Sequence, residues 1–385
     1  MRTSASITLI VAAGGLAFAQ APVPKASQDY ADAIAKAQDD LDAGRIAEAR
    51  QKLEATDKSL RGFEYDYLVA RSEAARANEP APDLLQTLEV PKVQTRFGVL
   101  NAVDRQLAFI CRDGGVRVHD LNNPKQPAKV VTYEGGGAIW TGAFSSDGKT
   151  FVAGFENGEV VVWNAKTWEH SVNVAVRNKP IRELAVAPDG SAFVAEGESA
   201  LELWSLAAAK PKKVADVGER YNFGEGLSFS PKGDLVATGG MFDILLYDAK
   251  TGKLSHSMKH ASYTMGLEFS PDGARIASAP RGNINKFLAV FDVSRGTMQF
   301  NVGPFPCYVH GGVFTSDGKR IVSTACETVP SLQLFDSATG NIMFSLPRAA
   351  TGTKPAVSQD GRLLGWSEQS GYQFIDLSKK QDSNE

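Results

Sequence analysis

The sequence predicts an all-β fold, a seven-bladed β-propeller that follows a small N-terminal α-helical segment. Two series of residues recur along the chain at nearly constant spacing. In the first, a Gly after Asp or Lys recurs after 42, 43, 40, 45 and 43 residues: Gly148, Gly190, Gly233, Gly273, Gly318 and Gly361. In the second, a mostly bulky residue precedes a small polar one every 40–44 residues: His119-Asp120, Trp163-Asn164, Trp204-Ser205, Tyr247-Asp248, Phe291-Asp292, Phe335-Asp336 and Ile375-Asp376. Seven repeats of this length are typical of four-stranded propeller blades.

Each repeat consists of short apolar runs separated by turn residues. In the repeat around Gly148, an apolar run ends at Phe144 and a Ser-Ser-Asp-Gly turn follows. Phe151-Val152-Ala153 and Val160-Val161-Val162-Trp163 then flank a turn at Asn157-Gly158. Such runs indicate strands rather than helices, and glycine tolerates the positive φ that tight turns require. We expect the bulky residue of each second-series pair to fill the gap between blades, and the Asx residue beside it to accept hydrogen bonds from turn amides.

The first 19 residues have the composition of a secretory signal peptide. Arg2 supplies the positive start, residues 7–16 supply the apolar stretch, and Ala17-Phe18-Ala19 forms a small-residue cleavage site before Gln20. The apolar stretch is short for a membrane span, which disfavours the alternative of an uncleaved anchor. We therefore expect an exported protein, periplasmic or extracellular, with no membrane insertion after cleavage.

Residues 20–25 are a Pro-containing, flexible leader, and residues 26–77 form a helical segment. Apolar residues recur there at three- and four-residue spacing, which indicates helices that each bury one face: Tyr30, Ala33, Ile34, Ala37 and Leu41, then Ile46, Ala49 and Leu53, then Phe63, Tyr67 and Leu68. Asp57 or Ser59 is expected to cap the third helix. Residues 41–55 resemble the turn and second helix of a tetratricopeptide-type hairpin. A segment this short cannot bury a solenoid core, so we expect it to pack on the propeller, on a second copy or on a partner.

The polar, Pro-rich residues 78–82 are the linker to the propeller, which occupies residues 83–377 and precedes a polar tail at 378–385. The way in which the ring closes follows from its two ends. Residues 83–88 look like the outermost strand of a blade, yet no second-series pair precedes them, and the last repeat stops without such a strand. We expect residues 83–88 to complete the last blade, because this arrangement protects edge strands that would otherwise pair with other chains.

Charge and motifs exclude several classes of function. The formal net charge is −3 and the pI is about 6.0, so the chain lacks the basic character that nucleic-acid binding requires. The sequence contains no G-x-S-x-G turn, no Gly-rich phosphate loop and no H-E-x-x-H helix. The histidines are dispersed, and the two that lie four residues apart fall on a strand and its exit loop: His119, His170, His256, His260 and His310. We expect no catalytic residue, no metal site and no cofactor.

The chain has three cysteines, Cys111, Cys307 and Cys326, so at least one thiol is left over within the chain. Cys307 lies in the connection that enters one blade, and Cys326 lies between the second and third strands of that blade. Both positions fall on the same face of the blade. Two alternatives stay open: a Cys307–Cys326 disulfide, or three separate and mostly buried thiols. In either case Cys111 is the thiol left over.

The repeats resemble those of the WD40-repeat family. The resemblance covers roughly residues 83–377 and is carried by Phe229-Ser230-Pro231-Lys232-Gly233, Phe269-Ser270-Pro271-Asp272-Gly273 and the pairs Trp163-Asn164, Tyr247-Asp248 and Phe335-Asp336. Residues 60–68 are similar to a segment that precedes WD40 repeats in some bacterial proteins. The sequence departs from the family in lacking strict Trp-Asp pairs and the Gly-His pair that often opens a repeat. The resemblance implies a propeller that serves as a non-enzymatic platform for protein partners.

One position in each repeat predicts a binding surface. The residues that stand seven before the Asp or Lys of each first-series turn should ring the entrance of the central channel: Trp140, Arg182, Glu225, Met265, His310 and Thr353. Two residues before three of these come Phe223, Tyr263 and Tyr308. Exposed aromatic side chains beside arginine are typical of protein-binding hot spots. We expect a partner protein to bind at this set, Thr353 excepted. The alternative is that the aromatic residues pack inward between blades.

Two classes of function therefore stay open. The favoured one is an exported, non-enzymatic protein–protein interaction platform. The alternative is an exported propeller enzyme, similar to a lactonase, hydrolase or dehydrogenase, with its site at the central channel. An enzyme would need several carboxylates or histidines to converge there, and this ring offers only Glu225 and His310. The sequence identifies neither the partner nor the oligomeric state.

Overall fold

The structure is a computed structural model of the 385-residue chain. It describes residues 25–76, 85–89, 95–197, 200–208, 210–219, 226–240, 242–260, 264–280, 287–302, 305, 309–325, 331–347, 355–368 and 371–377. The expected signal peptide at 1–19, the leader apart from Lys25, the linker at 78–82 and the tail at 378–385 lie outside these residues.

The N-terminal segment forms three α-helices and one short 3-10 helix: α1 (Lys25–Asp42), α2 (Ile46–Glu54), η1 (Lys58–Leu60) and α3 (Phe63–Arg76). Helix α1 begins one residue before the boundary expected from the sequence, and Tyr30, Ile34 and Ala37 are buried on one of its faces. The expected cap is placed differently. Asp57 accepts a hydrogen bond from the Ser59 amide and caps η1, whereas α3 begins four residues after Ser59. Arg61 is extended after η1, and residues 61 and 62 separate η1 from α3.

The rest of the described chain forms seven four-stranded antiparallel sheets, which confirms the predicted seven-bladed propeller. Blades 1 to 3 are β2 (Thr95–Asn101), β3 (Gln106–Cys111), β4 (Gly115–Asp120) and β5 (Lys129–Thr132); β6 (Ile139–Phe144), β7 (Thr150–Phe155), β8 (Glu159–Asn164) and β9 (His170–Ala175); and β10 (Leu184–Val186), β11 (Ala192–Glu196), β12 (Ala200–Ser205) and β13 (Lys212–Glu219).

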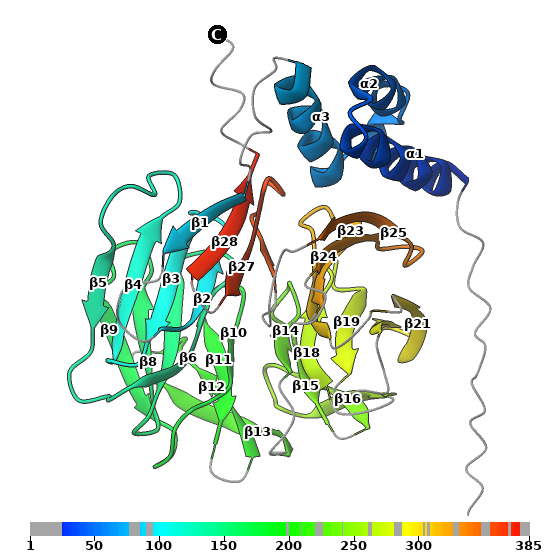
Figure 1. Cartoon of the computed structure of the whole chain (residues 1–385). Coiled ribbons are helices and arrows are strands. Elements are labelled where there is room, and N and C mark those ends of the chain that lie inside the picture. The colour runs from blue at the N-terminus through cyan, green and yellow to red at the C-terminus, as the bar shows by residue number, and fades with distance from the viewer. Residues whose placement is uncertain are drawn as a thin grey trace, which may run out of the picture.

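Blades 4 to 7 follow the same order. They are β14 (Leu227–Phe229), β15 (Leu235–Gly239), β16 (Asp243–Asp248) and β17 (Leu254–Lys259); β18 (Thr264–Phe269), β19 (Arg275–Pro280), β20 (Leu288–Asp292) and β21 (Thr297–Val302); β22 (Val309–Phe314), β23 (Arg320–Ala325), β24 (Ser331–Asp336) and β25 (Ile342–Pro347); and β26 (Ala356–Val357), β27 (Leu363–Glu368), β28 (Gly371–Asp376) and β1 (Leu85–Glu89). The first strands of neighbouring blades contact one another all the way round, so they are the inner strands of the ring. Figure 1 shows the blades in chain order from cyan to red.

The turns between the first and second strands of blades explain the recurring glycine. In blade 2, the Asp147 carboxylate accepts hydrogen bonds from the Ser145 hydroxyl at 2.7 Å and the Lys149 amide at 3.0 Å. Gly148 has φ +73°, in the left-handed region, and a Cβ there would lie 2.7 Å from Oδ1 of Asn101. A side chain at this position is therefore excluded both by backbone strain and by the neighbouring blade. In blade 1 no glycine stands in this turn, and Arg105 adopts φ +54° instead.

Among the described residues, the buried apolar side chains form seven clusters. Each cluster is shared by two neighbouring blades, and one of them also includes the helices. Trp163 of blade 2 packs with Ile110 and Val118 of blade 1, as the sequence predicts for the second series. The Asx residues beside these side chains act as expected. Asp336 Oδ1 accepts hydrogen bonds from the amides of Ala338 and Thr339 at 3.1 and 2.9 Å.

The ring is closed by a strand from the other end of the propeller. Strand β1 pairs with β28 in antiparallel register, with Thr87 opposite Gln373, and so occupies the outer position of blade 7. The segment expected at 83–88 thus corresponds to β1 at 85–89. A cross-blade ion pair supports the closure, because Arg105 of blade 1 lies 2.5 Å from the fully buried Asp376 carboxylate of blade 7.

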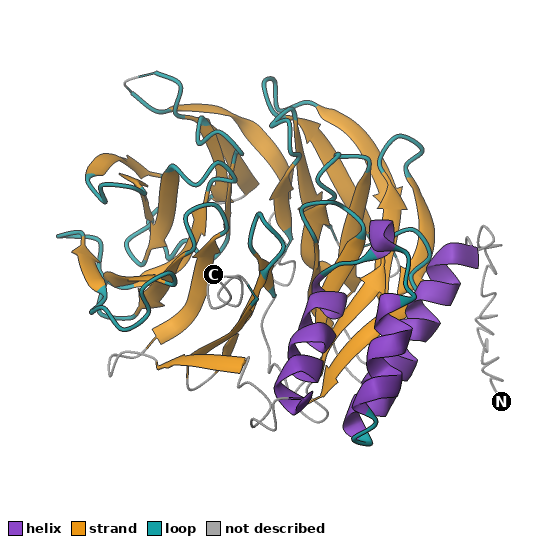
Figure 2. Ribbon diagram, turned by 90° about the horizontal axis from the view of Figure 1, so that it is seen from above, coloured by secondary structure: helices purple, strands orange, loops and turns teal. Residues whose placement is uncertain are grey.

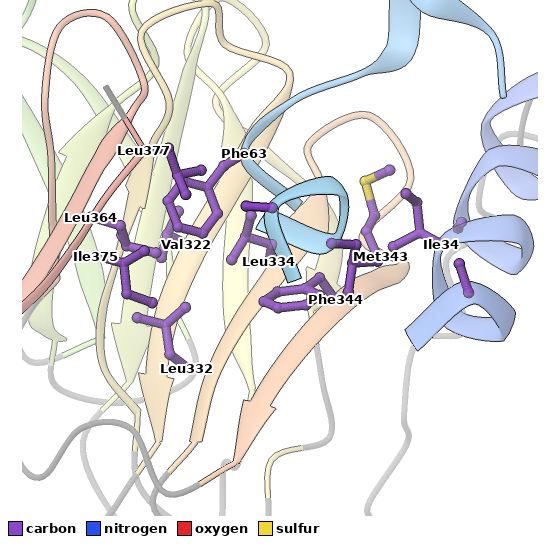
Figure 3. Close-up of a cluster of buried hydrophobic side chains, with 14 of the residues drawn as sticks. Ile34, Phe63, Val322, Leu332, Leu334, Met343, Phe344, Leu364, Ile375 and Leu377 are labelled. Carbon is purple, nitrogen blue, oxygen red and sulfur yellow. The ribbon is translucent and has the colours of Figure 1, made fainter. Parts of the chain in front are cut away.

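The helical segment packs on the propeller, which is one of the three surfaces that the sequence left open for it. Figures 1 and 2 show the helices beside the outer strands of blade 6 and next to blade 7. Ile34 and Phe63 share one buried cluster with Met343 and Phe344 of β25 and with Leu364 of β27, as Figure 3 shows. The Tyr67 ring meets the Phe344 ring edge-on at a centroid distance of 5.3 Å. The core of this segment is therefore continuous with the core of the propeller.

A buried polar triad fixes this contact. Glu64 is fully buried, and its Oε1 accepts hydrogen bonds from the Tyr30 hydroxyl at 2.8 Å and from Arg320 Nη2 at 2.8 Å. Arg320, itself 3% exposed, also donates to the Leu60 carbonyl. A buried ion pair is most favourable when its remaining polar atoms are satisfied. Residues from α1, η1 and β23 supply partners here, whereas Glu64 Oε2 is a buried atom without a hydrogen-bond partner in the described structure. Helices α1 and α3 are thereby joined to the start of β23.

Candidate functional site

Four inner strands begin with an irregularity that sets the position of the candidate site. The ladder between the first two strands of the blade skips Arg96 in β2, Trp140 in β6, Met265 in β18, and His310 with Gly311 in β22. A β-bulge of this kind bends the strand and re-aims the side chain of the extra residue. The sheet register therefore singles out the same position that the sequence spacing predicts. We call the end of the ring at which the inner strands begin the top face.

The structure describes the side chains of two of the eight predicted binding residues, Trp140 and Arg182. Arg182 lies two residues before β10 and is exposed. The backbones of Met265 and His310 are the second residues of β18 and β22, while their side chains are outside the described part. The remaining four lie wholly outside it: Phe223, Glu225, Tyr263 and Tyr308.

The structure brings Trp140 and Arg182 together and adds a residue that the sequence analysis missed. The guanidinium carbon of Arg96 lies 3.8 Å from the centroid of the Trp140 ring, and that of Arg182 lies 5.2 Å from it. These three side chains come from blades 1, 2 and 3 in order. Each cation–π contact contributes about 0.5–1 kcal/mol at an exposed site. The sequence left two alternatives for the aromatic residues, exposed at the surface or packed between blades. Trp140 is half-buried and is therefore intermediate between the two.

Arg96 escaped the sequence analysis for a definable reason. The candidate position was counted back from the turn glycine, and blade 1 has none. Counting from the second-series pair would have found it, because Arg96 precedes His119 by 23 residues as Trp140 precedes Trp163. The second series, but not the first, therefore marks Arg96 as the equivalent of Trp140.

The electrostatics around Trp140 are dominated by arginine. Burial is the main cause that lowers the pKa of Arg96, and the positive charges of Arg112 and Arg182 lower it further. The Glu156 carboxylate acts in the opposite direction. Among the described residues, no carboxylate forms an ion pair with any of the three arginines. We refer to Arg96, Arg112, Trp140 and Arg182 as the top-face cluster.

The acidic groups nearest to the top-face cluster in the chain are engaged elsewhere. Asp113 forms a bidentate pair with Arg117, at 2.6 and 2.5 Å. Glu196 pairs with the buried Arg177 at 3.2 Å. Glu183 accepts a 2.6 Å hydrogen bond from the Gly226 amide of blade 4. These carboxylates therefore hold the framework and do not neutralise the cluster.

The segment that carries Arg182 is fixed by Arg177. The Arg177 guanidinium donates to the carbonyl groups of Lys179, Pro180 and Gly197, at 3.0, 2.5 and 2.8 Å. Glu196, its ion-pair partner, accepts a hydrogen bond from the Arg182 amide at 3.2 Å. Arg182 thus extends from a rigid loop, which lowers the entropic cost of holding its side chain for a ligand.

Phe242 is a second residue that the sequence analysis did not single out. It lies in the turn between β15 and β16, the counterpart of the turns that carry Arg112 in blade 1 and Glu156 in blade 2, and it is 56% exposed. That turn position belongs to the top face, because the Glu156 amide donates to the Ala138 carbonyl just before β6 at 2.8 Å. A phenylalanine in a turn that polar residues and glycine occupy in blades 1 and 2 was the available signal.

The other chemistry considered from the sequence does not assemble among the described residues. His256 is exposed on β17, whereas His260 is buried and bonded to the Ser278 hydroxyl at 3.1 Å, so the two imidazoles do not share a site. The described residues contain no cluster of His, Cys, Asp or Glu able to hold a metal ion. None of the described helices combines the length and apolar character of a membrane span. Cys111 is a buried thiol, and Cys307 and Cys326 lie outside the described residues.

Comparisons with known proteins agree with the fold. Residues 128–164, from β5 to β8, match the family model "WD domain, G-beta repeat". The chain is 23% identical over 207 residues to "Periodic tryptophan protein 2 homolog" of Dictyostelium discoideum, an alignment that covers 52% of this chain and 22% of that protein. It is 25% identical over 194 residues to "Protein HIR1" of Kluyveromyces lactis, covering 42% and 22%, respectively. It is 23% identical over 209 residues to "B-type cell cycle switch protein ccs52B" of Medicago truncatula, covering 51% and 42%. The chain thus spans less than half the length of these relatives, and the similarity supports a WD40-type propeller.

Proposed function

We propose that this WD40-type propeller is a non-enzymatic protein-interaction platform that acts outside the cytoplasm and binds its partner at the top face. The WD-repeat match and the similarity to WD40 propeller proteins support a scaffold role. The helical segment gives the propeller a second exposed surface, but its apolar face is already covered by blades 6 and 7. The top face is therefore the better candidate for binding.

The observation that carries this proposal is the stack of Arg96, Trp140 and Arg182 across three blades. Tryptophan and arginine are the side chains most enriched at binding hot spots, because they combine large contact area with directed polar groups. The stack holds the indole and both guanidinium groups in place before a partner arrives, which lowers the entropic cost of association. Nothing among the described residues favours the enzyme alternative, since the groups gathered here are cations and an indole.

Partner capture with the full chain tests the proposal. The immobilised protein is exposed to the exported fraction of the source cells, and Trp140→Ala is compared with the unchanged chain. Loss of a hot spot costs about 2 kcal/mol or more, so we expect capture to weaken by about 30-fold or more. Leu254→Ser, which changes a 55% exposed residue on the outer strand β17, is the matched control and should leave capture unchanged.

The double variant Trp140→Ala with Tyr263→Ala should abolish capture while the melting temperature falls by only a few degrees. Retained capture would contradict the top-face assignment. A large loss of stability would instead assign these aromatic residues to packing between blades.

Export is a separate part of the proposal. It is supported by the charged start at Arg2, the apolar residues 7–16 and the small residues before Gln20. Sequencing the N-terminus of the protein recovered from the exported fraction tests it. We expect the mature chain to begin at Gln20, and an intact Met1 in a cytoplasmic fraction would contradict export.

A further inference from the structure

The top-face cluster has a charge opposite to that of the molecule as a whole. The chain carries a net charge of −3, yet Arg96 and Arg182 lie over the same indole ring, and the charge of Arg112 also acts on Arg96. Like charges in proximity are unfavourable, and the partial burial of Arg96 increases the cost because screening by water is weaker there. Of the nearby carboxylates, Asp113, Glu183 and Glu196 have other partners, which leaves Glu156 as the partial counter-charge.

The geometry leaves donors available to a ligand. When a guanidinium group lies over an aromatic ring, its N–H groups remain directed outward in its own plane, where a carboxylate can accept two of them. In the described structure, Arg96 Nε and Trp140 Nε1 are buried atoms without a hydrogen-bond partner. An unpaired buried donor is costly, but these two atoms are covered in this arrangement, so the donors open to a carboxylate are the guanidinium groups of the exposed Arg112 and Arg182.

We propose that the top-face cluster binds a carboxylate-rich, acidic peptide segment of the partner, with Arg112 and Arg182 receiving the carboxylates and Trp140 packing against the peptide. This inference rests on the proposed function and names the chemistry of its partner. Charge complementarity selects an acidic segment over a basic or neutral one. Two of the arginines come from blade 1 and one from blade 3, with Trp140 of blade 2 between them, which suits an extended peptide with several carboxylates better than a single small anion.

A labelled hexaglutamate peptide is the probe, and hexaglutamine is its neutral counterpart. Binding to the full-length protein is measured by fluorescence anisotropy at low and high salt, and the indole N–H resonance of Trp140, assigned with Trp140→Phe, is followed by NMR. We expect hexaglutamate to bind at low salt, to shift this resonance and to weaken as salt screens the charges. Hexaglutamine should not bind.

Charge-removing variants test which residues are used. Arg182→Gln and Arg112→Gln both change exposed side chains, so their folding should be intact. Each should weaken hexaglutamate binding by about 10-fold or more, because a hydrogen bond to a charged group contributes about 1.5–3 kcal/mol. Glu156→Gln should tighten binding by removing the opposing charge. Arg295→Gln, at a 78% exposed arginine in the turn between β20 and β21 at the opposite end of its blade, should leave it unchanged.

Equal binding of hexaglutamate to the unchanged chain and to Arg182→Gln and Arg112→Gln would overturn the proposal. So would the absence of binding at low salt, or tighter binding of a phosphoserine peptide of equal charge, which would assign the cluster to phosphate. The two proposals fail separately. If partner capture depends on Trp140 but hexaglutamate does not bind, the platform function stands and the acidic ligand is wrong.

Discussion

The imidazole of His119 is a titratable group held in an apolar setting. It takes the second-series position of blade 1, meets the Phe109 ring edge-on at 5.5 Å, and has both ring nitrogens buried without a hydrogen-bond partner in the described structure. Burial lowers the pKa of His119 below its usual value of 6.5. The folded chain therefore favours the neutral imidazole more strongly than the unfolded chain does.

This burial predicts a loss of stability in mild acid. As the pH falls below about 6.5, the unfolded state binds a proton at His119 before the folded state does, so the free energy of unfolding decreases. The stabilisation that His119 gives the folded state is fully present above the pKa of this residue in the unfolded chain. Its loss amounts to at most about 1.4 kcal/mol per pH unit. His119→Phe should flatten the dependence of the unfolding free energy on pH between 7 and 5. His256→Gln, which removes an exposed imidazole, is the control. If His119→Phe left the slope of unfolding free energy against pH unchanged, the prediction would be contradicted.

Single residues were predictable from the sequence where a repeat imposed them. The turn at Gly148 and the Asx positions were recognisable because backbone geometry allows few alternatives there. The stack around Trp140 was only half predictable, since spacing placed Trp140 and Arg182 at equivalent positions but said nothing of Arg96 or of the distances between the rings and the cations. Side-chain contacts between blades depend on the rotation from one blade to the next, which periodicity does not encode.

At the scale of elements, the contact of α3 with β23 depends on the ion pair of Glu64 and Arg320. Removing one partner of a buried pair leaves an uncompensated charge and costs about 3–5 kcal/mol. Arg320→Met should therefore lower the unfolding free energy by about that amount in urea titrations. Glu64→Leu combined with Arg320→Met should regain most of it, because two apolar side chains of similar volume can replace such a pair.

The surface pair of Arg50 and Glu54 provides the control. These side chains lie 3.7 Å apart on α2 and are partly or largely exposed, so Arg50→Met should cost less than about 1 kcal/mol. If Arg320→Met behaved like Arg50→Met, the triad would not hold the helices on the propeller. Hydrogen exchange of the α3 amides then separates local release of the helices from global unfolding.

The helical elements show where sequence reasoning stops. Three-residue and four-residue spacing predicted the buried faces of α1 and α2, including Ile34 and Leu53. It could not decide what covers them, because an apolar stripe has the same pattern whether it meets a blade, a second copy or a partner. The docking on β25 depends on long-range complementarity, such as the Tyr67–Phe344 contact, between residues almost 280 positions apart.

At the scale of the whole molecule, each blade owes its burial to its neighbours. The seven apolar clusters lie between blades, so no sheet has a complete core of its own, and the cluster of Phe109 and Phe374 joins the last blade to the first. The number of blades and the closing strand were predictable from the sequence. A period of about 40 residues corresponds to one four-stranded blade, and the extra strand before the first blade matches the outer strand that the last blade lacks. Closure should therefore contribute to stability over the entire ring.

A disulfide across the closure measures this contribution. Thr87 of β1 and Gln373 of β28 are directly opposite in the antiparallel ladder, where Cα atoms lie about 4.5–5.5 Å apart, within the range that a disulfide spans. Thr87→Cys with Gln373→Cys should form a bond that closes almost the whole propeller. Gln333→Cys with Ser345→Cys is the matched control, because these residues hold the same positions in the ladder of β24 and β25 but close a short loop inside blade 6. Loop-closure entropy predicts a gain of about 6 kcal/mol for the long loop and about 3 kcal/mol for the short one, each relative to its reduced form. Mass spectrometry establishes whether the disulfide has formed, and urea titration measures the gain in unfolding free energy. Two outcomes would show that the ends are not held together in this register. In one, the two thiols react with a probe but not with each other; in the other, the gain for the long loop is no larger than that for the control.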